Sequence, residues 1–262
     1  MISTDHRALF VHIPKCGGQS VERFFLRALG LTWEQRDRLQ LRLNQDPSKG
    51  PPRLAHMTAA EYVRWGYLTP EEFRSYYKFA FVRNPWARLV SEYRYRPFHV
   101  HRYDFKTFVM RRFPTPGWSD VYRHVMPQVD YLTDADGRLL VDFIGKLENF
   151  AADFATVCAA LGFPQAELPR TNVTRVEAGG LFSRNMLYRL QGALHGYFGA
   201  PEHRDYRDYY DDETREYVGH YYRHDIKSFG YGFDPPATVG GPIALRAGRT
   251  PADLGVATPL NG

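Results

Sequence analysis

Short apolar runs alternate along the chain with longer segments in which apolar residues recur every three or four positions. The runs 8–13 (ALFVHI), 78–83 (KFAFVR) and 139–144 (LLVDFI) predict buried strands. The segments 18–29 and 148–161 have helical spacing, and a glycine follows each of them. Strands that alternate with helices predict an α/β fold with a central, mainly parallel sheet flanked by helices.

Other elements are indicated by their first residues. Thr58 and Thr69 are each followed three positions later by glutamate, which predicts two capping boxes. Asn84 and Pro85 predict an N-cap and the first turn of a helix that runs to about residue 96. We also expect helices at 33–43, 104–113, 184–190 and 213–224, and a short strand at 53–56.

The pattern divides the chain into two parts. Residues 1–233 carry the alternating elements and predict a single domain. Residues 234–262 are rich in Pro, Gly, Ala and Thr, which predicts a flexible tail with little core.

Charge and cysteine content narrow the class of protein. A net charge of +5 and a pI of about 9.1 favour anionic partners such as nucleotides or acidic sugars. The basic residues are interleaved with acids, which argues against a nucleic-acid partner. Two cysteines far apart give neither a disulfide framework nor a CxxC metal site.

Neither a signal peptide nor a membrane span is expected. The N-terminus lacks the apolar stretch of a signal peptide, and no apolar run approaches the ~18 residues of a spanning helix. We therefore expect a cytoplasmic protein; peripheral membrane association and the oligomeric state stay open.

A glycine-rich loop, PKCGGQS (14–20), follows the first predicted strand. Such a loop collects free backbone N–H groups and the positive end of a helix dipole, which favours a phosphate. Gly17 and Gly18 would let the backbone wrap around it, and Lys15 and Ser20 would add a charge and a hydroxyl. Lys15 precedes the glycines, so the loop does not match the GxxxxGK[ST] of an ordinary ATPase. A tight turn with a solvent-facing lysine is the alternative.

A second strand-to-helix junction, FVRNPWARLVSEY (81–93), offers another anion site. Arg83 closes the strand, and Ser91 follows eight residues later, roughly two helical turns away. A guanidinium and a hydroxyl can share one phosphate, although Arg83 could instead pair with a surface carboxylate. Two phosphate sites at the carboxyl ends of two strands suit a nucleotide with phosphates at both ends.

Together these two motifs resemble the membrane-type carbohydrate sulfotransferase family, which includes the heparan sulfate 2-O-sulfotransferases and bacterial relatives. The resemblance covers roughly residues 7–233 and includes RLAHMT (53–58) and the blocks at 141–163 and 206–233. It implies a single P-loop-like α/β domain and a PAPS-dependent sulfotransferase of the EC 2.8.2 type. PAPS is 3′-phosphoadenylyl sulfate, and the implied acceptor is a carbohydrate or glycolipid. No metal is implied.

The resemblance also implies roles for single residues. The first loop would bind the 5′-phosphosulfate of PAPS, while Arg83 and Ser91 would bind its 3′-phosphate. His56 would be the general base, and Lys15 would stabilise the leaving phosphate. The predicted donor-binding residues are Pro14, Lys15, Cys16, Gly17, Gly18, Gln19, Ser20, Arg83 and Ser91. Cys16 and Gln19 stand where the family often has threonine, so Cys16 is expected to contact the donor through its backbone N–H.

Aromatic and basic residues between 93 and 131 suit an acidic glycan as the acceptor, although a half-buried aromatic surface would have the same composition. They are Tyr93, Tyr95, Arg96, His99, His101, Arg102, Tyr103, Trp118, Tyr122, Arg123 and His124. Asp130 and Glu148 are candidates to tune His56, and the segment 206–210 is a candidate lid over the nucleotide. The spacing of His99 and His101 suits zinc, but no third ligand accompanies them, so no metal site is predicted.

Three alternatives remain at this stage. A kinase-like P-loop phosphotransferase would need Mg²⁺ and an acid after a strand, for which Asp142 is the candidate. A catalytically inactive module would bind PAP, the product nucleotide, without transfer. His56 could also be a hydrogen-bonded structural histidine at a strand end.

Overall fold

At the centre of the fold is a five-stranded sheet in the order β1-β2-β3-β4-β5. The computed structural model describes residues 1–95, 103–163 and 205–234, with Gly241, Ile243 and Ala244. The strands are β1 (Ile2–Ser3), β2 (Ala8–Val11), β3 (Tyr77–Val82), β4 (Phe143–Lys146) and β5 (Ile243–Ala244). The three central strands are parallel, and the two edge pairs are antiparallel. The predicted α/β fold with a mainly parallel sheet is therefore confirmed.

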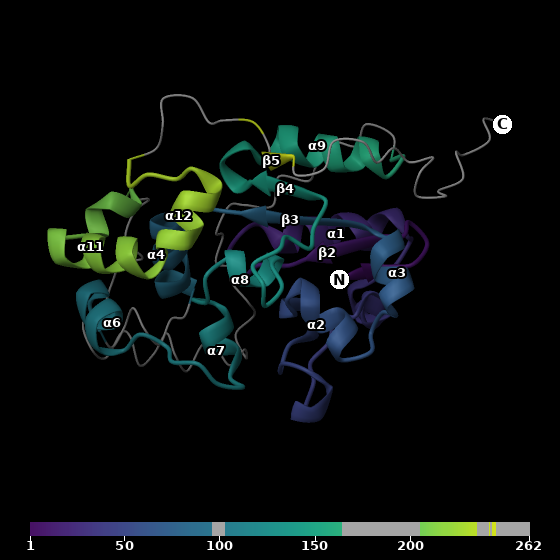
Figure 1. Ribbon diagram of the computed structural model, residues 1–262, viewed down its shortest axis with the longest axis horizontal. Helices are drawn as coiled ribbons and strands as arrows, with labels where there is room; N and C mark the ends of the chain where they lie inside the picture. The colour runs from purple at the N-terminus through teal and green to yellow at the C-terminus, as the bar shows by residue number, and fades with distance from the viewer. Residues whose placement is uncertain (96–102, 164–204, 235–240, 242, 245–262) are drawn as a thin grey trace, which may run out of the picture.

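Both faces of the sheet are covered, so the three central strands are buried along their whole length. Every residue of β3 is buried. The helices α1 (Gly18–Ala28) and α9 (Phe150–Ala160) meet over one face, where the rings of Phe24 and Phe154 lie 5.0 Å apart. Figure 1 shows α2 (Ala59–Arg64) and α8 (Val129–Leu132) across the sheet from α9.

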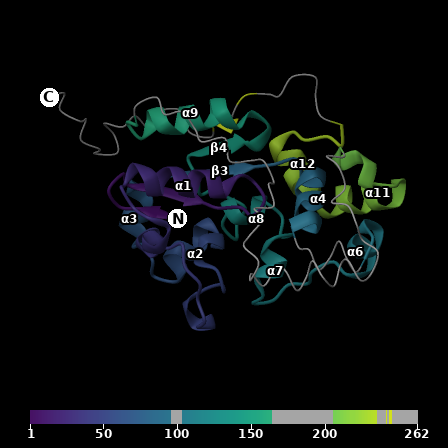
Figure 2. The same ribbon diagram turned by 180° about the vertical axis from the view of Figure 1, so that it is seen from behind.

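A second apolar cluster lies beyond the carboxyl end of β3. It is formed by α4 (Pro85–Tyr95), α6 (Phe105–Arg111), α11 (Asp212–Tyr221) and α12 (Arg223–Phe229). Trp86, Phe108 and Val218 are among its buried residues. Figure 2 shows these helices gathered at the end of the molecule away from α3 (Pro70–Ser75). The carboxyl edge of the sheet therefore faces this helical part of the molecule.

Local signals placed most helix starts correctly. Thr58 and Thr69 form the two predicted capping boxes, at the starts of α2 and α3. The side-chain oxygen of Asn84 accepts the N–H groups of Trp86 and Ala87, so α4 begins at Pro85 as predicted. Asp104 caps α6 within the predicted helix 104–113.

Other predicted elements differ from the structure. The strand predicted at 139–144 is displaced toward the C-terminus, because Leu139 bridges Thr133 and the sheet pairing begins only at Phe143. The segments predicted as a strand at 53–56 and a helix at 33–43 contain 3₁₀ helices instead. The first residues of the helix predicted at 148–161 form a 3₁₀ turn. The helix predicted at 213–224 divides at Tyr222 into α11 and α12.

Two predictions concern segments that lie wholly or largely outside the described residues. The helix expected at 184–190 lies outside the described residues. Of the segment expected to be a tail, the structure describes 234, 241, 243 and 244, and the last two form β5 against β4. Within the described ranges, no helix has the length and apolar character needed to cross a membrane.

We expect the loss of one buried ion pair to destabilise this sheet strongly. Asp142 lies 2.8 Å from the ammonium of Lys78 and also accepts the Lys78 backbone N–H, and both residues are buried. In Asp142→Ala the buried ammonium would lose its counter-ion, which costs about 3–5 kcal/mol. Urea unfolding measures this loss. The control is Asp136→Ala, which removes an exposed pair with Arg138 and should not move the midpoint. Equal midpoints for the two variants would contradict the prediction.

Candidate functional site

The loop 14–17, for which the sequence predicts an anion cradle, lies between β2 and the start of α1. Lys15 and Gly17 adopt left-handed backbone angles, with φ of 69° and 84°, which turns the chain sharply into the helix. Helix α1 has neither a side-chain cap nor an acidic residue in its first turn, whereas α2, α3, α6 and α11 are each capped by a side chain. The positive end of the α1 dipole is therefore open to an anion, although the Ser20 N–H donates to the Gly17 carbonyl at 3.0 Å.

The two glycines of the loop are required by close packing. A side chain at Gly18 would overlap the imidazole ring of His12. A Cβ at Gly17 would lie 2.8 Å from the side chain of Leu147, which follows β4. The loop therefore packs closely against side chains that follow β2 and β4.

The side chains of the loop point in different directions. The ammonium of Lys15 lies 3.8 Å from the centre of the Tyr95 ring. The thiol of Cys16 is buried and donates to the side-chain oxygen of Gln128 at 3.2 Å, and burial raises its pKa to about 12. Gln19 is exposed and Ser20 is buried. Cys16 can therefore face an anion in the cradle only through its backbone.

The second motif meets the first at the carboxyl edge of the sheet. The guanidinium of Arg83 is 3.4 Å from the carbonyl oxygen of Lys15, and it forms no ion pair with a described carboxylate. Ser91 lies on α4, partly exposed, without a hydrogen bond to Arg83. The backbone N–H of Asn84 donates to Glu148 at 2.7 Å, so this carboxylate occupies the start of α4. An anion beside Arg83 would have to be held by side chains.

A buried arginine that the sequence did not single out joins the cradle to the rest of the site. Arg88 is 1% exposed and donates to the carbonyl oxygens of Pro14, His124 and Met126 at 3.0, 3.0 and 2.8 Å. Three carbonyl acceptors satisfy the buried guanidinium without a carboxylate. The only sequence signal was its position in the second motif, where a helical arginine is usually exposed.

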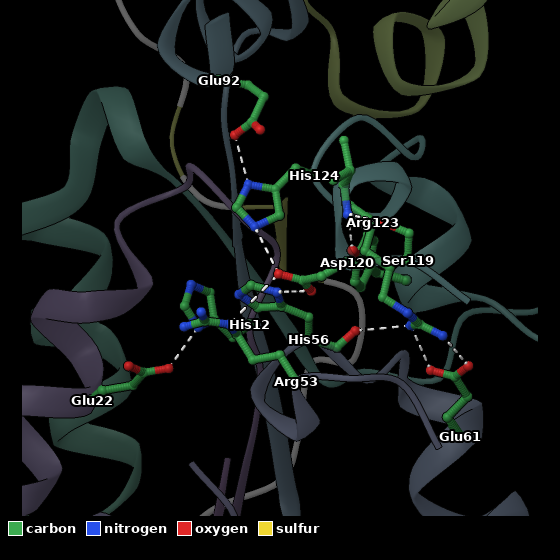
Figure 3. A network of polar contacts seen from close by, with 12 residues as sticks. His12, Glu22, Arg53, His56, Glu61, Glu92, Ser119, Asp120, Arg123 and His124 are labelled. Atoms are coloured by element: carbon green, nitrogen blue, oxygen red, sulfur yellow. Dashed lines mark hydrogen bonds and ion pairs between the residues drawn. The ribbon is translucent and has the colours of Figure 1, made fainter. Parts of the chain in front are cut away.

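Three histidine rings stand in a row beside the cradle (Figure 3). The ring of His56 lies 5.1 Å from that of His12 and 5.0 Å from that of His124, and all three are buried. Each has a carboxylate at its Nδ1: Glu22 at 2.6 Å for His12, Asp120 at 2.8 Å for His56 and Glu92 at 2.6 Å for His124.

His56, in the middle of the row, is held in the form that accepts a proton. Burial lowers its pKa to about 3; the hydrogen bond with Asp120 opposes this shift, and the charges of His12 and His124 reinforce it. Because a carboxylate only accepts, Nδ1 carries the hydrogen and Nε2 keeps its lone pair. No hydrogen bond from the described residues reaches Nε2.

The structure corrects several predicted neighbours of His56. Its partner is Asp120 of α7 (Asp120–Arg123), a residue 64 positions away. The prediction for Asp130 and Glu148 is wrong: Asp130 is exposed on α8, and Glu148 accepts from Asn84 and from the Tyr231 hydroxyl.

The residues predicted to bind the acceptor do not form one surface among the described residues. Arg123 makes a two-pronged ion pair with Glu61. Tyr93 belongs to the second cluster, and its hydroxyl donates to the backbone carbonyl of Tyr103. Tyr210, in the predicted lid, donates to the carbonyl of Trp86 on α4. Tyr95 and Trp118 remain about half exposed. Arg96, His99, His101 and Arg102 lie outside the described residues.

The described residues also contain one group with metal-ligand geometry, which the sequence did not reveal. The ligand atoms of His56, Asp120 and His124 lie within 4.8 Å of one another. Contacts of 2.8 and 3.3 Å from Asp120 to the two rings account for this closeness. We therefore read the group as hydrogen-bonded.

The structure removes the acidic residue that the kinase alternative would need after a strand. Asp142 precedes β4 rather than following it, so it lies at the opposite edge of the sheet from the cradle. There it is engaged by Lys78.

Comparisons with known proteins identify the family of the chain. A family model described as "Sulfotransferase family" matches residues 1–232. An uncharacterized protein of Archaeoglobus fulgidus is 36% identical over 95 residues, which are 36% of this chain and 73% of that protein. Human carbohydrate sulfotransferase 14 is 26% identical over 182 residues, covering 58% of this chain and 44% of the human protein. No solved structure matches the chain.

The packing of the cradle predicts that Gly18 tolerates no side chain. In Gly18→Ala the methyl group must displace His12, and overpacking of this kind costs typically ~1–3 kcal/mol. Thermal unfolding measures the loss. Gly117→Ala is the matched control because no atom lies within 4 Å of a Cβ there. Unchanged melting of Gly18→Ala would show that the cradle is looser than described.

Proposed function

The chain belongs to the sulfotransferase family, and on that premise we propose that it transfers the sulfuryl group of PAPS to a hydroxyl of a carbohydrate or glycoconjugate. One observation carries the proposal: the anion cradle and a buried neutral imidazole lie on either side of His12. The ring of His12 fills the space above Gly18 and meets the ring of His56 at 5.1 Å. A donor in the cradle would thus lie close to a base.

The donor would be held by residues of both strand ends. The start of α1, which has neither a side-chain cap nor an acidic residue in its first turn, suits the 5′-phosphosulfate, and Lys15 adds a positive charge. Arg83 and Ser91 are proposed to bind the 3′-phosphate, for which Arg83 has a guanidinium without a described carboxylate partner. Binding of this polyanion would release Lys15 from the face of Tyr95.

Transfer needs a base, a stabilised leaving group and alignment, by analogy with phosphoryl transfer. Nε2 of His56 takes the proton of the acceptor hydroxyl while the acceptor oxygen bonds to sulfur. The bond from sulfur to the bridging phosphate oxygen breaks, and Lys15 stabilises the charge on that oxygen. Asp120 then faces a positively charged ring, which it stabilises. The negative charge of the donor would raise the pKa of His56 toward a useful value.

A carbohydrate acceptor is supported by the name of the human relative and by exposed groups around His56. Trp118, two residues before Asp120, is 45% exposed and donates to the carbonyl of Gly50. Arg53, about half exposed, lies 3.6 Å from Asp120. An exposed indole and a half-exposed arginine suit a sugar ring that carries an acidic group.

We also propose a cytoplasmic setting. Both cysteines, Cys16 and Cys158, are free and buried thiols, which is usual in a reducing compartment.

We expect labelled sulfate to pass from PAPS to a glycan or glycolipid fraction of the source cell, and this transfer to depend on His56. Loss of a general base costs 10²–10⁴-fold in rate, so His56→Gln should retain at most about 1% of kcat. Lys15→Ala should also remove most turnover. The control is His220→Gln, an exposed histidine of α11. Normal turnover in His56→Gln would end the base assignment.

A thermal-shift assay distinguishes a sulfotransferase from a kinase and from an inactive binding module. Stabilisation by PAP without Mg²⁺ supports the sulfotransferase, whereas stabilisation only by ATP with Mg²⁺ supports a kinase. Stabilisation by PAP with no labelled acceptor would indicate a binding module.

The lowered pKa of His56 predicts an unusual titration. A free histidine becomes charged as the pH falls through about 6.5. His56, with a pKa of about 3, should stay neutral in the unliganded protein down to pH 5. The NMR resonances of its ring should therefore not shift between pH 8 and pH 5, while those of a reference histidine peptide do. A midpoint near 6.5 for His56 would contradict the prediction.

A further inference from the structure

Two lysines among the described residues are buried, and they lie at opposite edges of the central sheet. Lys78, at the amino end of β3, pairs with the buried Asp142 at 2.8 Å. Lys146 is the last residue of β4, at the carboxyl edge, and is 9% exposed. Its ammonium lies 5.0 Å from the centre of the Tyr231 ring, and no described carboxylate pairs with it.

The sheet itself gives no reason for a charge at the end of β4. Taking an ammonium out of water is costly, and lysine is almost never fully buried unless a partner compensates it. A tyrosine ring attracts a cation more weakly than a carboxylate does, so it offsets part of that cost. The other residues of β4 are Phe, Ile and Gly, and an apolar side chain in place of Lys146 would suit this strand better.

Lys146 stands beside the anion site that the second motif predicts. In the sheet it pairs with Val82, the residue before Arg83. The backbone N–H of Asn84, the residue after Arg83, donates to Glu148 at 2.7 Å. These contacts on either side of Arg83 keep the end of β4 next to it. Because neighbouring strands lie about 4.8 Å apart, an ammonium and a guanidinium at their ends can reach one phosphate.

The carboxylate in this region is already engaged. One oxygen of Glu148 accepts the Asn84 N–H, and the other accepts the Tyr231 hydroxyl at 3.0 Å. Glu148 forms an ion pair with neither Arg83 nor Lys146. It also occupies the start of α4, so an anion beside Arg83 would have to be held by side chains, and Lys146 supplies one.

The glycine-rich loop closes another side of the same place. The guanidinium of Arg83 is 3.4 Å from the carbonyl oxygen of Lys15. A Cβ at Gly17 would lie 2.8 Å from the side chain of Leu147, the residue after Lys146. Two neighbouring cations without described carboxylate partners repel each other unless an anion lies between them.

We propose that Lys146 is a donor-binding residue that holds the 3′-phosphate of PAPS together with Arg83, and so selects nucleotides that carry this phosphate. The phosphate would draw the ammonium from the Tyr231 ring and give it charged oxygen acceptors, which are stronger partners. This role rests on the proposed function, in which the donor is PAPS.

The first test compares two nucleotides by isothermal titration calorimetry without Mg²⁺. Adenosine 5′-monophosphate differs from PAP only in lacking the 3′-phosphate, and the unmodified protein should prefer PAP. Lys146→Met removes the charge and keeps a long side chain. It should weaken PAP binding about 10–100-fold, the usual loss for a hydrogen bond to a charged group, and change binding of the monophosphate less than about threefold. Lys227→Met, at an exposed lysine of α12, should change neither affinity.

The second test observes Lys146 in the unmodified protein, so it holds even if a variant fails to fold. With carbon-13 at the lysine Cε atoms, the signal that is lost in Lys146→Arg belongs to Lys146. Saturating PAP should shift this signal, and saturating monophosphate should shift it far less. An unmoved signal, or equal shifts with the two nucleotides, would overturn the proposal.

Thermal unfolding without nucleotide distinguishes this role from a structural one. Lys146→Met removes a cation that has no described counter-ion, so it should melt no lower than the unmodified protein. A lower melting temperature together with an unchanged preference for PAP would assign Lys146 to the fold and overturn its role in binding.

The outcomes separate this proposal from the proposed function. If the unmodified protein binds PAP no more tightly than the monophosphate, both fail. A preference for PAP that persists in folded Lys146→Met overturns only the role of Lys146. A preference that depends on Lys146, in a protein that transfers no sulfuryl group to any acceptor, confirms the binding role and ends the proposal of transfer.

Discussion

The hydrogen bonds of the buried Arg88 guanidinium to three carbonyl groups join the parts of the site. One bond reaches Pro14 in the glycine-rich loop 14–20, and the others reach His124 and Met126 beside the histidine row. A buried charge is stable only when it is well solvated by the protein, so these three backbone positions are constrained together. The glycine-rich loop and the histidine row consequently depend on one side chain of α4.

Charge balance is the second constraint at this edge of the sheet. Each of the three histidines has a carboxylate at Nδ1, and the middle ring is buried deeply enough to be neutral. Such pairing sets the tautomer of a ring as well as its orientation, and in enzymes it leaves a defined nitrogen to accept a proton. The carboxylate partners satisfy the three buried rings, which would otherwise be costly, and leave Nε2 of His56 without a hydrogen bond from the described residues.

Much of the fold could be predicted because the signals were local. The capping boxes at Thr58 and Thr69, the start of α4 at Asn84 and the glycine-rich loop each depend on residues within a few positions of one another. The boundaries of strand β4 could not be predicted from local residues. Its apolar run begins at Leu139, but pairing with β3 starts only at Phe143, because partners distant in sequence set the register.

The sequence by itself determined the α/β class and the position of the loop 14–20 and of Arg83 at the carboxyl ends of two strands, and the resemblance proposed His56 as the base. These features depend on short spacing and on resemblance, both of which can be read along one segment. Only the tertiary structure decided that Asp120 is the partner of His56, that His124 stands between two carboxylates and that Cys16 faces Gln128. The reason is topological: parallel strands bring the ends of segments about 30 to 110 positions apart to one edge, and no local pattern encodes which polar groups then meet.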